Sequence, residues 1–453
     1  MNKETQRILN YVLQKDPEQK EFHQAVTAFL TSIDSVIEYE PQYTYHKILE
    51  RLVEPERIII FRVPWVDDNG RLQINRGYRV QQNSALGPYK GGLRFHSSVN
   101  LSILKFLAFE QVFKNSLTGL PLGGGKGGSD FNPKRKSDNE VMRFCQSFMT
   151  ELSKHIGENT DIPAGDMGVG SREIGYMFGQ YKRMKTEVTG VLTGKGLSFG
   201  GSLIRPEATG YGLIYLTQAV LEAEKDSINN KRCLVSGAGN VAQFTIEKIN
   251  QLGGKVISIS DSNGIIIDKE GINNEKLEWI KILKNVKRER IIKYKEKYPN
   301  SIYIERTGKE KYNELWNIKA DLAFPCAVQN EINLLDAQNL IKNGIKLIAE
   351  GANMPTSLEA HRLILKSPIL FIPGKAANAG GVAVSGLEMS QNSEHIPWSK
   401  EEVDTKLQDI MKNIYKQISY AADKYSTHNN FTDGANIAGF LKVAEAMLAQ
   451  GYV

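Results

Sequence analysis

Three lysines, Lys90, Lys114 and Lys126, lie in or beside glycine-rich or apolar stretches, where their ammonium groups could do chemistry. Lys126 has five glycines within three residues, and such flanks let a backbone fold closely around a ligand with the ammonium projecting into it. Because neighbouring cations lower one another's pKa, a lysine in such a group can act as an acid or base. Asp166, in the glycine-rich loop 163–170, is a turn former by default but a candidate proton carrier beside these lysines.

A second motif, Gly237-Ala-Gly-Asn-Val-Ala242, follows a predicted strand and opens a predicted helix. Gly237 permits the tight turn, Gly239 lets the backbone approach a pyrophosphate, and Ala242 keeps the helix close to the sheet. The free N–H groups and partial positive charge of the helix N-terminus would hold the pyrophosphate. The order of strand, glycine turn, helix and second strand therefore predicts a dinucleotide-binding turn.

The residues after the second strand bear on which nicotinamide cofactor binds. Asp261 closes that strand, where an acidic side chain usually binds the ribose 2′-OH and so indicates NAD. The basic group Lys287-Arg-Glu-Arg290 could instead meet the 2′-phosphate of NADP, although a solvated helix face is its simplest interpretation. Fold rules alone leave NAD and NADP open.

The N-terminal part of the chain, which must position the lysines, mixes helices and strands. Apolar residues recur at helical spacing through the first fifty residues. Strands are predicted at 57–66 and 72–80, joined by the hairpin turn Asp67–Gly70. A helix with an apolar stripe is predicted at 98–116, and a glycine-rich loop at 119–128 follows it. This section is predicted to form an α+β unit.

From Arg205 the chain alternates short apolar strands with helices, which is typical of a parallel doubly wound sheet. Residues 262–312 are rich in Lys, Asn and Glu, and we interpret this stretch as a solvated surface. The predicted strands are 233–236, 255–260, 320–324, 346–350 and 369–373, and the predicted helices are 206–224, one from Asn240, and two near 331–342 and 357–366. Past Gly374 the pattern is helical, and a helix at 434–450 is expected to pack on the first domain.

The expected fold class is therefore α/β, with an N-terminal α+β domain, a Rossmann-like doubly wound domain and a C-terminal helical segment that returns to the first domain. The corresponding ranges are 1–202, 203–375 and 376–453. A length of 453 residues exceeds what one hydrophobic core usually serves, which also favours two domains.

Composition argues against several classes of protein. The formal net charge of +6 is slight for this length and spread along the chain, so nucleic acid is not expected as a partner. No stretch reaches the roughly 18 apolar residues that a membrane span needs, and the N-terminus has no apolar signal segment. Three widely spaced cysteines favour a reducing compartment, and the seven histidines never fall at zinc-ligand spacing. We expect a cytoplasmic protein with no metal site and no membrane partner.

Several long blocks of the sequence, taken in order, resemble the small, microbial-type NADP-linked glutamate dehydrogenases over nearly the whole chain. These enzymes belong to the hexameric Glu/Leu/Phe/Val dehydrogenase family. The blocks are Gly87-Pro-Tyr-Lys-Gly-Gly-Leu-Arg-Phe95, Pro121-Leu-Gly-Gly-Gly-Lys-Gly-Gly-Ser-Asp130, Asp161-Ile-Pro-Ala-Gly-Asp-Met-Gly-Val-Gly170, Lys195-Gly-Leu-Ser-Phe-Gly-Gly-Ser202, Arg205-Pro-Glu-Ala-Thr-Gly-Tyr-Gly212, Glu350-Gly-Ala-Asn-Met-Pro355 and Gly374-Lys-Ala-Ala-Asn-Ala-Gly-Gly381.

The resemblance implies reversible reductive amination, in which 2-oxoglutarate, ammonium and NADPH give L-glutamate. Lys126 then corresponds to the catalytic lysine that polarises the 2-oxo group and activates water, and Asp166 to the acid/base that moves protons to and from the nitrogen. The resemblance also implies substrate contacts: the α-carboxylate end for Gln111 and Lys114, a backbone contact for Gly165, and the γ-carboxylate for Lys90 and Ser385.

For the cofactor, the resemblance implies NADP(H) rather than NAD, because related NADP-linked members carry Ser-Asp-Ser where this chain has Ser260-Asp261-Ser262. Substrate binding and oligomerisation fall to the domain 1–202, cofactor binding falls to 203–375, and a homohexamer is the family expectation. The candidate cofactor-binding residues are Thr209, Gly237, Gly239, Asn240, Val241, Asp261, Ser262, Lys287, Arg290, Asn353 and Asn378.

Two other functions remain as alternatives. One is a branched-chain or aromatic amino-acid dehydrogenase of the same family, which Lys90 argues against because an ammonium facing an apolar side chain would lack a partner. The other is a non-catalytic protein that holds RNA or anionic metabolites on its lysines. No basic motif interleaved with aromatic residues supports RNA binding.

Overall fold

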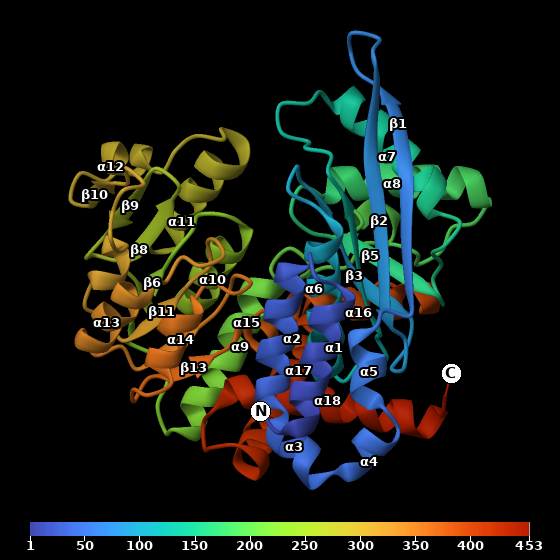
Figure 1. Cartoon of the computed structure of the whole chain (residues 1–453). Helices are drawn as coiled ribbons and strands as arrows, with labels where there is room; N and C mark the ends of the chain where they lie inside the picture. Colours follow the sequence, from blue (N-terminus) through green and yellow to red (C-terminus); the bar gives the residue numbers. More distant parts are fainter. Residues whose placement is uncertain (453) are drawn as a thin grey trace. The chain divides into compact units, whose positions relative to one another are not determined.

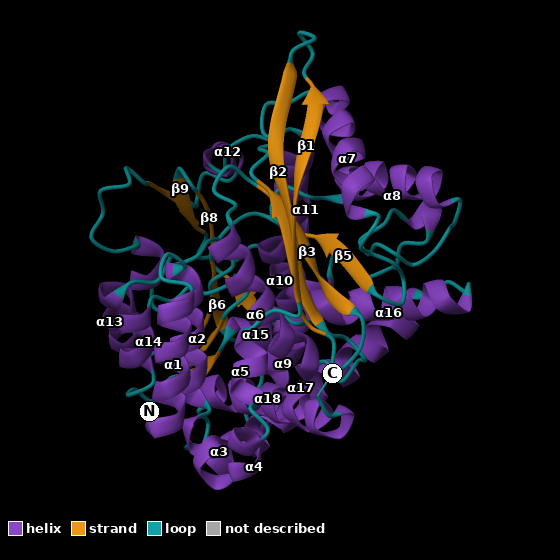
Figure 2. Cartoon of the chain, turned by 45° about the vertical axis from the view of Figure 1, so that its right-hand side comes forward, coloured by secondary structure: helices purple, strands orange, loops and turns teal. Residues whose placement is uncertain are grey.

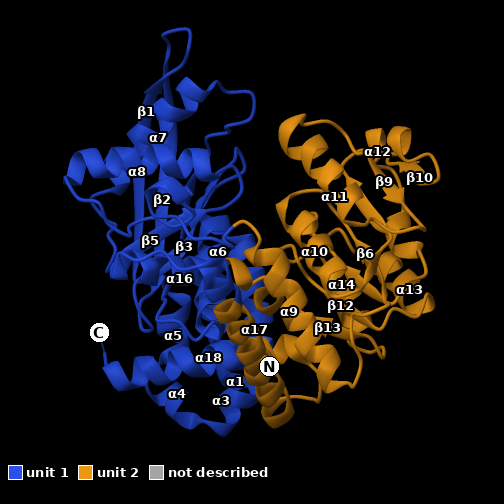
Figure 3. Cartoon of the chain, turned by 180° about the vertical axis from the view of Figure 1, so that it is seen from behind, with its two compact units in different colours: residues 1–205, 382–404, 436–453 blue, residues 206–381, 405–435 orange. Residues whose placement is uncertain are grey.

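The computed structural model describes residues 1–452, and the chain divides into two compact units, coloured blue and orange in Figure 3. Unit 1 comprises 1–205, 382–404 and 436–453, and unit 2 comprises 206–381 and 405–435. The C-terminal helices are therefore shared between the units, and most of the last helix belongs with the N-terminal part of the chain.

Unit 1 contains a group of short N-terminal helices and then a mixed sheet with three longer helices (Figures 1 and 2). The helices predicted in the first fifty residues and the strand hairpin are confirmed. The elements are α1 (Lys3–Lys15), α2 (Lys20–Ser32), α3 (Asp34–Tyr39), α4 (Pro41–Tyr45), α5 (Ile48–Val53), β1 (Arg57–Val66), β2 (Leu72–Asn83), β3 (Tyr89–Phe95), α6 (Leu101–Leu117), β4 (Gly124–Ser129), α7 (Asp138–Leu152), β5 (Asp161–Gly165), α8 (Ser171–Lys185) and η1 (Leu197–Phe199), with most of α16 (Gly380–Glu394) and α18 (Phe431–Gln450).

The sheet of unit 1 has the order β1-β2-β4-β3-β5. Strands β1, β2 and β4 pair antiparallel, and β3 pairs parallel with both β4 and β5. Helices α7 and α8 bury Phe144, Phe148 and Met177 in one core with Trp65 and Phe95 of the sheet. Helix α6 packs on the sheet with a second, smaller cluster, so the lysine-bearing strands β3 and β4 lie in the interior of the sheet.

The glycine-rich segment 119–128 was predicted as a loop, but its second half is a strand, so the prediction was wrong for 124–128. Residues 124–129 form β4, between β2 and β3. The glycines are needed because the neighbouring elements lie too close for side chains. A Cβ on Gly124 would lie 2.4 Å from Val112 Cγ2 of α6, and a Cβ on Gly91 would lie 1.7 Å from Gly125 O. The same holds in part for 163–170, whose first residues end strand β5.

A buried arginine crosses beneath these glycine strands. Arg79 of β2 donates from Nε to Asp161 Oδ2 at 2.9 Å and from Nη1 to Gly91 O at 3.1 Å, and its Nη2 also pairs with Asp161. A Cβ on Gly127 would lie 3.0 Å from Arg79 Cδ, so that glycine leaves room for the side chain. The ion pair therefore ties β2 to β5 across the two strands between them.

Unit 2 contains the predicted parallel sheet, in the order β13-β12-β11-β6-β7. A separate three-stranded antiparallel sheet has the order β10-β9-β8. The elements are α9 (Ala208–Ala223), β6 (Arg232–Val235), α10 (Asn240–Gln251), β7 (Lys255–Val256), β8 (Ser258–Asp261), β9 (Gly264–Ile267), α11 (Asn274–Lys281), η2 (Ile282–Val286), α12 (Ile292–Lys297), β10 (Ile302–Glu305), η3 (Glu314–Asn317), β11 (Leu322–Phe324), α13 (Leu334–Lys342), β12 (Leu347–Ala349), α14 (Leu358–Ile364), β13 (Leu370–Ile372) and α15 (Gly374–Ala377), with most of α17 (Lys400–Tyr425).

Two predictions for unit 2 need correction. The single strand expected at 255–260 changes partners at Ile257, whose N–H donates to Cys233 O at 3.0 Å while its carbonyl accepts from Asp268 N at 2.9 Å. Strand β7 therefore belongs to the parallel sheet and β8 to the antiparallel one. The stretch 262–312 is more than a solvated surface, because it supplies the strands β9 and β10 and the helices α11, η2 and α12. The short apolar run Ile265–Ile267, which lies in β9, was missed because most of the surrounding stretch is polar or charged.

Over residues 1–452, no helix combines the length and the apolar character that a membrane crossing requires.

We expect Arg79→Met to lower the free energy of unfolding by about 3–5 kcal/mol, because it leaves Asp161 as an uncompensated buried charge. Urea unfolding at a fixed protein concentration measures the change. The control is Lys154→Met, whose ion pair with Glu151 is 56% and 39% exposed, and it should change stability by less than ~1 kcal/mol. Equal stability of the two variants would contradict the proposed importance of the Arg79–Asp161 pair.

Candidate active site

Lys126 and Asp166, predicted as partners, meet in unit 1. Lys126 lies on the interior strand β4, and its Nζ is 3.2 Å from Asp166 Oδ2. Asp166 directly follows β5, and the same carboxylate oxygen accepts from Arg94 Nε at 2.9 Å. The Lys126 side chain is only 7% exposed and that of Asp166 19%. Two cations on adjacent strands therefore share one carboxylate that solvent barely reaches.

The surroundings of this pair change the pKa of both groups. Burial lowers the pKa of Lys126 below its usual value, Asp166 opposes that shift, and the Arg94 and Arg79 cations add to it. Burial by itself would raise the pKa of Asp166, but Lys126 and Arg94 outweigh it and bring the pKa to about 2. At neutral pH Asp166 is therefore a carboxylate, and the Lys126 ammonium loses its proton more readily than that of an ordinary lysine.

Helix α6 adds a second lysine and a glutamine to this group. Lys114 lies in the last turn of α6, and Gln111 one turn before it donates to Asn115 Oδ1 at 2.7 Å. Burial, and after it the Lys126 ammonium, lowers the pKa of Lys114 to about 8, while Asp166 acts in the opposite direction. The electrostatic effect of Lys126 on Lys114 places the two side chains in one cluster.

Lys90 on β3 is almost fully buried, with 1% of the residue exposed. Its Nζ donates to Thr193 Oγ1 at 2.7 Å and to Ile162 O at 3.0 Å. Both acceptors are neutral, so the ammonium has no carboxylate directly bonded to it among the described residues. Burial lowers the pKa of Lys90 well below its usual value. An anionic ligand placed here would restore the charged form.

Ser385 and Arg205, which are far apart in sequence, are hydrogen-bonded in unit 1. Ser385 is buried on α16, and its Oγ accepts from Arg205 Nε at 3.0 Å. Burial lowers the pKa of Arg205, and the Glu388 carboxylate on the same helix raises it. Sequence reasoning named Ser385 but missed Arg205 and Thr193. Arg205 stands in one of the blocks that carried the family resemblance, which was the available signal.

This arrangement of buried cations can hold a dicarboxylate. Lys114 and Gln111 lie together on α6, while Arg205 is bonded to Ser385 and acts electrostatically on both Lys90 and Lys114. Lys126 has the lowered pKa and the adjacent carboxylate that proton transfer requires. The backbone of Gly165, which Asp166 follows, ends β5 beside β3.

The dinucleotide turn in unit 2 has the predicted geometry. Gly237 adopts φ +81 after β6, which is the left-handed conformation that favours glycine. A Cβ on Gly239 would meet nothing within 4 Å, so the backbone at the start of α10 is open to a ligand. Val241 lies in the first turn of α10, and Asn240 donates to Pro206 O at 2.7 Å, just before Thr209 in α9. These residues fit a bound pyrophosphate.

The acidic residue expected at the ribose is already bonded by the protein. Asp261 Oδ2 accepts from Ile291 N at 2.9 Å and from Lys284 Nζ at 3.2 Å, and its Oδ1 accepts from Asn263 N. Ser262 is exposed, and its Oγ accepts from Arg290 Nη1 at 2.7 Å. The Ser262 hydroxyl and the Arg290 guanidinium together suit a ribose that carries a 2′-phosphate better than one that carries a free 2′-OH.

The other cofactor candidates lie at separate places in unit 2. Asn378 is buried and donates to Asn353 Oδ1 at 2.8 Å, so these two residues are brought together. Lys287 is exposed directly after η2. Among the described contacts, Arg290 bonds the Ser262 hydroxyl, and Lys287 does not.

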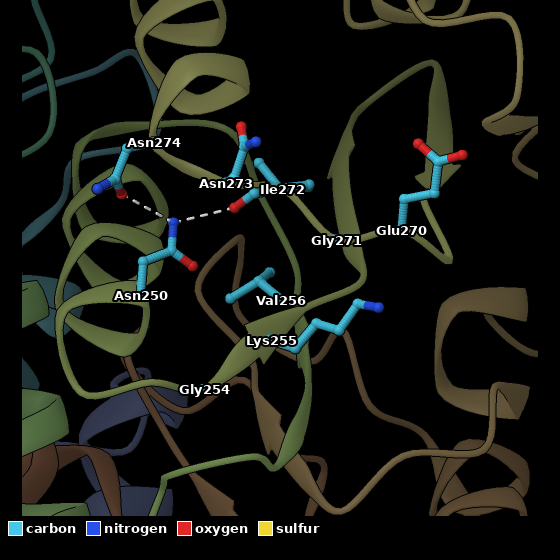
Figure 4. Close-up of a pocket in the computed structure, with 9 residues that line it drawn as sticks. All are labelled: Asn250, Gly254, Lys255, Val256, Glu270, Gly271, Ile272, Asn273 and Asn274. Atoms are coloured by element: carbon cyan, nitrogen blue, oxygen red, sulfur yellow. Dashed lines mark hydrogen bonds between the residues drawn. The ribbon is translucent and has the colours of Figure 1, made fainter.

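A cavity of about 250 Å³ lies elsewhere in unit 2, between the end of α10 and the start of α11 (Figure 4). Asn250 on its wall donates to Ile272 O at 3.0 Å and to Asn274 Oδ1 at 3.1 Å. The lysines of unit 1 and the turn at Gly237 do not line it. The cavity is therefore separate from both parts of the candidate site.

Comparison with known protein families gives two matches. The family model described as Glutamate/Leucine/Phenylalanine/Valine dehydrogenase matches residues 200–451. The model described as Glu/Leu/Phe/Val dehydrogenase, dimerisation domain, matches residues 55–183. Together they cover the dinucleotide turn and the lysine-bearing strands.

Individual relatives are similar over almost the whole chain. An NADP-specific glutamate dehydrogenase of Giardia intestinalis is 57% identical over 448 residues, with 99% of each chain covered. One of Helicobacter pylori is 56% identical over 450 residues, covering 98% of this chain and 99% of that one. Among solved structures, Plasmodium falciparum glutamate dehydrogenase is 51% identical with a TM-score of 0.96, covering 99% of this chain and 95% of that one.

We expect Lys114 to be half-deprotonated near pH 8, because burial and the Lys126 ammonium lower its pKa to about 8. Asp166→Asn should move this midpoint to lower pH, because it removes a carboxylate that raises the Lys114 pKa. Acetylation of Lys114 as a function of pH, followed by peptide mass spectrometry, measures the midpoint against a free lysine peptide that titrates near ~10.4. Equal midpoints for Lys114 and that peptide would show that the cluster does not act on Lys114.

Proposed function

The chain belongs to the Glutamate/Leucine/Phenylalanine/Valine dehydrogenase family, and we propose that its buried lysine cluster is the substrate site of an NADP-linked glutamate dehydrogenase. The reaction is the reversible reductive amination of 2-oxoglutarate with ammonium to L-glutamate, with NADP(H) as cofactor. The observation that carries the site assignment is the Lys126–Asp166 pair, which lies among buried cations that suit a dicarboxylate.

Lys126 and Asp166 perform the proton transfers in this proposal. In reductive amination the Lys126 ammonium donates a hydrogen bond to the 2-oxo oxygen and so polarises the carbonyl for attack by ammonia. In the reverse direction the neutral amine of Lys126 accepts a proton from the water that attacks the substrate carbon. Lys126 and Arg94 together hold the pKa of Asp166 near 2, so deprotonation of Lys126 makes Asp166 a better proton acceptor. Asp166 then carries protons to and from the substrate nitrogen.

The two ends of the substrate bind to different residues of the cluster. Lys114 and Gln111 hold the α-carboxylate, with the backbone of Gly165 as a further contact. Lys90 and Ser385 hold the γ-carboxylate, and Arg205, which donates to Ser385, adds positive charge there. The γ-carboxylate supplies the anionic partner that Lys90 lacks in the described structure.

The cofactor residues of this chain bind and orient NADP(H), which supplies the hydride when it is bound. The open turn at Gly239 and the N-terminus of α10 hold the pyrophosphate. Ser262 and Arg290 hold the 2′-phosphate, while Lys284 neutralises Asp261 and so removes a repulsive charge beside it. Thr209, Asn240, Asn353 and Asn378 are proposed as further contacts.

A dehydrogenase for branched-chain or aromatic amino acids is not favoured. The substrates of such an enzyme would leave the Lys90 ammonium buried against an apolar group, at the cost of an unpaired charge. The Giardia intestinalis and Helicobacter pylori relatives, both more than half identical over nearly the full chain, are glutamate dehydrogenases.

We also propose a homohexamer in the cytoplasm, with the division into substrate and cofactor domains expected from the sequence. Support for assembly comes from the outer face of the β1–β2 hairpin. Ile60, Leu72 and Ile74 there are 52%, 65% and 61% exposed, and β1 is an edge strand. The family model that spans this hairpin carries the description of a dimerisation domain. Exposed apolar side chains along an edge strand are typical of a surface that another subunit covers.

Purified protein should oxidise NADPH with 2-oxoglutarate and ammonium, and Lys90→Leu should reduce kcat/KM for 2-oxoglutarate by about 10²-fold, because a charged hydrogen bond to the substrate is lost. The same variant should lose far less activity with 2-oxovalerate, which has the same chain length but no γ-carboxylate. Initial rates of NADPH oxidation measure both effects, and Lys154→Leu, an exposed site, is the matched control. Parent-like kinetics of Lys90→Leu on 2-oxoglutarate would refute the γ-carboxylate role.

A further inference from the structure

Helix α16 carries a buried glutamate one turn after Ser385. Glu388 is fully buried, and its carboxylate accepts from Gly194 N at 2.9 Å, from Lys195 N at 3.3 Å and from Lys195 Nζ at 2.9 Å. Residues three apart share one face of a helix, so Ser385 and Glu388 face the same side of α16. One carboxylate therefore bonds two consecutive backbone N–H groups and one ammonium.

The segment that Glu388 holds is the one that bonds Lys90. Thr193, whose Oγ1 accepts from Lys90 Nζ at 2.7 Å, directly precedes Gly194. Lys195 Nζ closes the segment by donating to Leu192 O and, at 2.8 Å, to Asn392 Oδ1 on α16. Thr193 thus directly precedes two residues that are bonded to α16. The acceptor of Lys90 and the serine bonded to Arg205 are therefore connected through Glu388.

The charge of Glu388 also acts on both cations of this group. Burial lowers the pKa of Lys90, Glu388 raises it, and Arg205, Arg79 and Lys195 lower it further. Glu388 lies on α16, Arg205 before α9, Arg79 on β2, and Lys195 in the segment 192–195. Glu388 is the one anion among these four groups. Burial also lowers the pKa of Arg205, and Glu388 again opposes the shift.

We propose that Glu388 is a positioning residue for the γ-carboxylate of the substrate. It fixes the segment carrying Thr193 to the helix carrying Ser385, and its negative charge favours the charged form of Lys90. This inference rests on the proposed function, because it assumes that Lys90 and Ser385 bind the γ-carboxylate.

A purely structural role and an electrostatic role predict different pH dependences. Glu388→Gln keeps the size of the side chain but removes the charge that raises the Lys90 pKa, so Lys90 should lose its proton at lower pH. The alkaline limb of the kcat/KM profile for 2-oxoglutarate should therefore move to lower pH. A merely loosened site would weaken binding equally at every pH.

The experiment uses the full-length enzyme and measures kcat and KM for 2-oxoglutarate, ammonium and NADPH across the pH range. Glu388→Gln should raise the KM for 2-oxoglutarate about tenfold on the alkaline side and much less at acid pH, with the KM for NADPH unchanged. Glu388→Asp, which keeps the charge, should restore the position of the alkaline limb. Glu394→Gln, an exposed site on the same helix, should behave like the parent.

Each outcome bears on a different claim. A pH-independent rise in KM for Glu388→Gln, or parent-like kinetics, would overturn the inference about Glu388. An unchanged KM for Lys90→Leu would overturn the proposed subsite itself. If Glu388→Gln does not fold, Thr193→Val tests the same connection. It should raise the KM for 2-oxoglutarate but not that for NADPH, and an unchanged KM would overturn the inference.

Discussion

The close approach of β3, β4 and α6 determines where the reactive side chains of unit 1 lie. Side chains larger than hydrogen at Gly91 and Gly124 would collide with Gly125 O and with Val112. Because these positions are glycines, Lys126 on β4 and Lys90 on β3 lie in adjacent interior strands, and α6 brings Lys114 beside them. The glycines therefore serve the packing of the protein itself, and that packing sets the positions of Lys90 and Lys126.

Strands packed this closely also bury charge, and the buried carboxylates of unit 1 are each shared by several donors. Asp161 joins Arg79 and Gln81, Asp166 joins Arg94 and Lys126, and Glu388 joins Lys195 to two backbone N–H groups. Lys90 is bonded only to neutral oxygens among the described residues. Under the proposed function, the two carboxylates of the substrate would complete this charge balance and offset the cost of burying the cations.

The sequence allowed the periodic elements and the dinucleotide turn to be predicted, because apolar spacing and a glycine turn between strand and helix are local signals. Strand β4 could not be predicted from such signals, since Gly-Gly-Lys-Gly-Gly-Ser has no apolar alternation and its neighbours alone make it a strand. Thr193, Arg205 and Glu388 lie far apart in sequence, and only the fold brings them to Lys90 and Ser385. The Asp261 side chain was placed correctly at a strand end, but its bonds to Lys284 and Ile291 were not visible in the sequence.

The central claim is that Lys126, held against Asp166 on a buried strand, performs the chemistry. The most direct test is the turnover of Lys126→Ala with saturating 2-oxoglutarate, ammonium and NADPH, together with NADPH binding measured by fluorescence. We predict a loss in kcat of about 10³-fold with NADPH binding unchanged, because the acid/base group is removed while unit 2 is intact. Turnover at the parent rate would contradict the account.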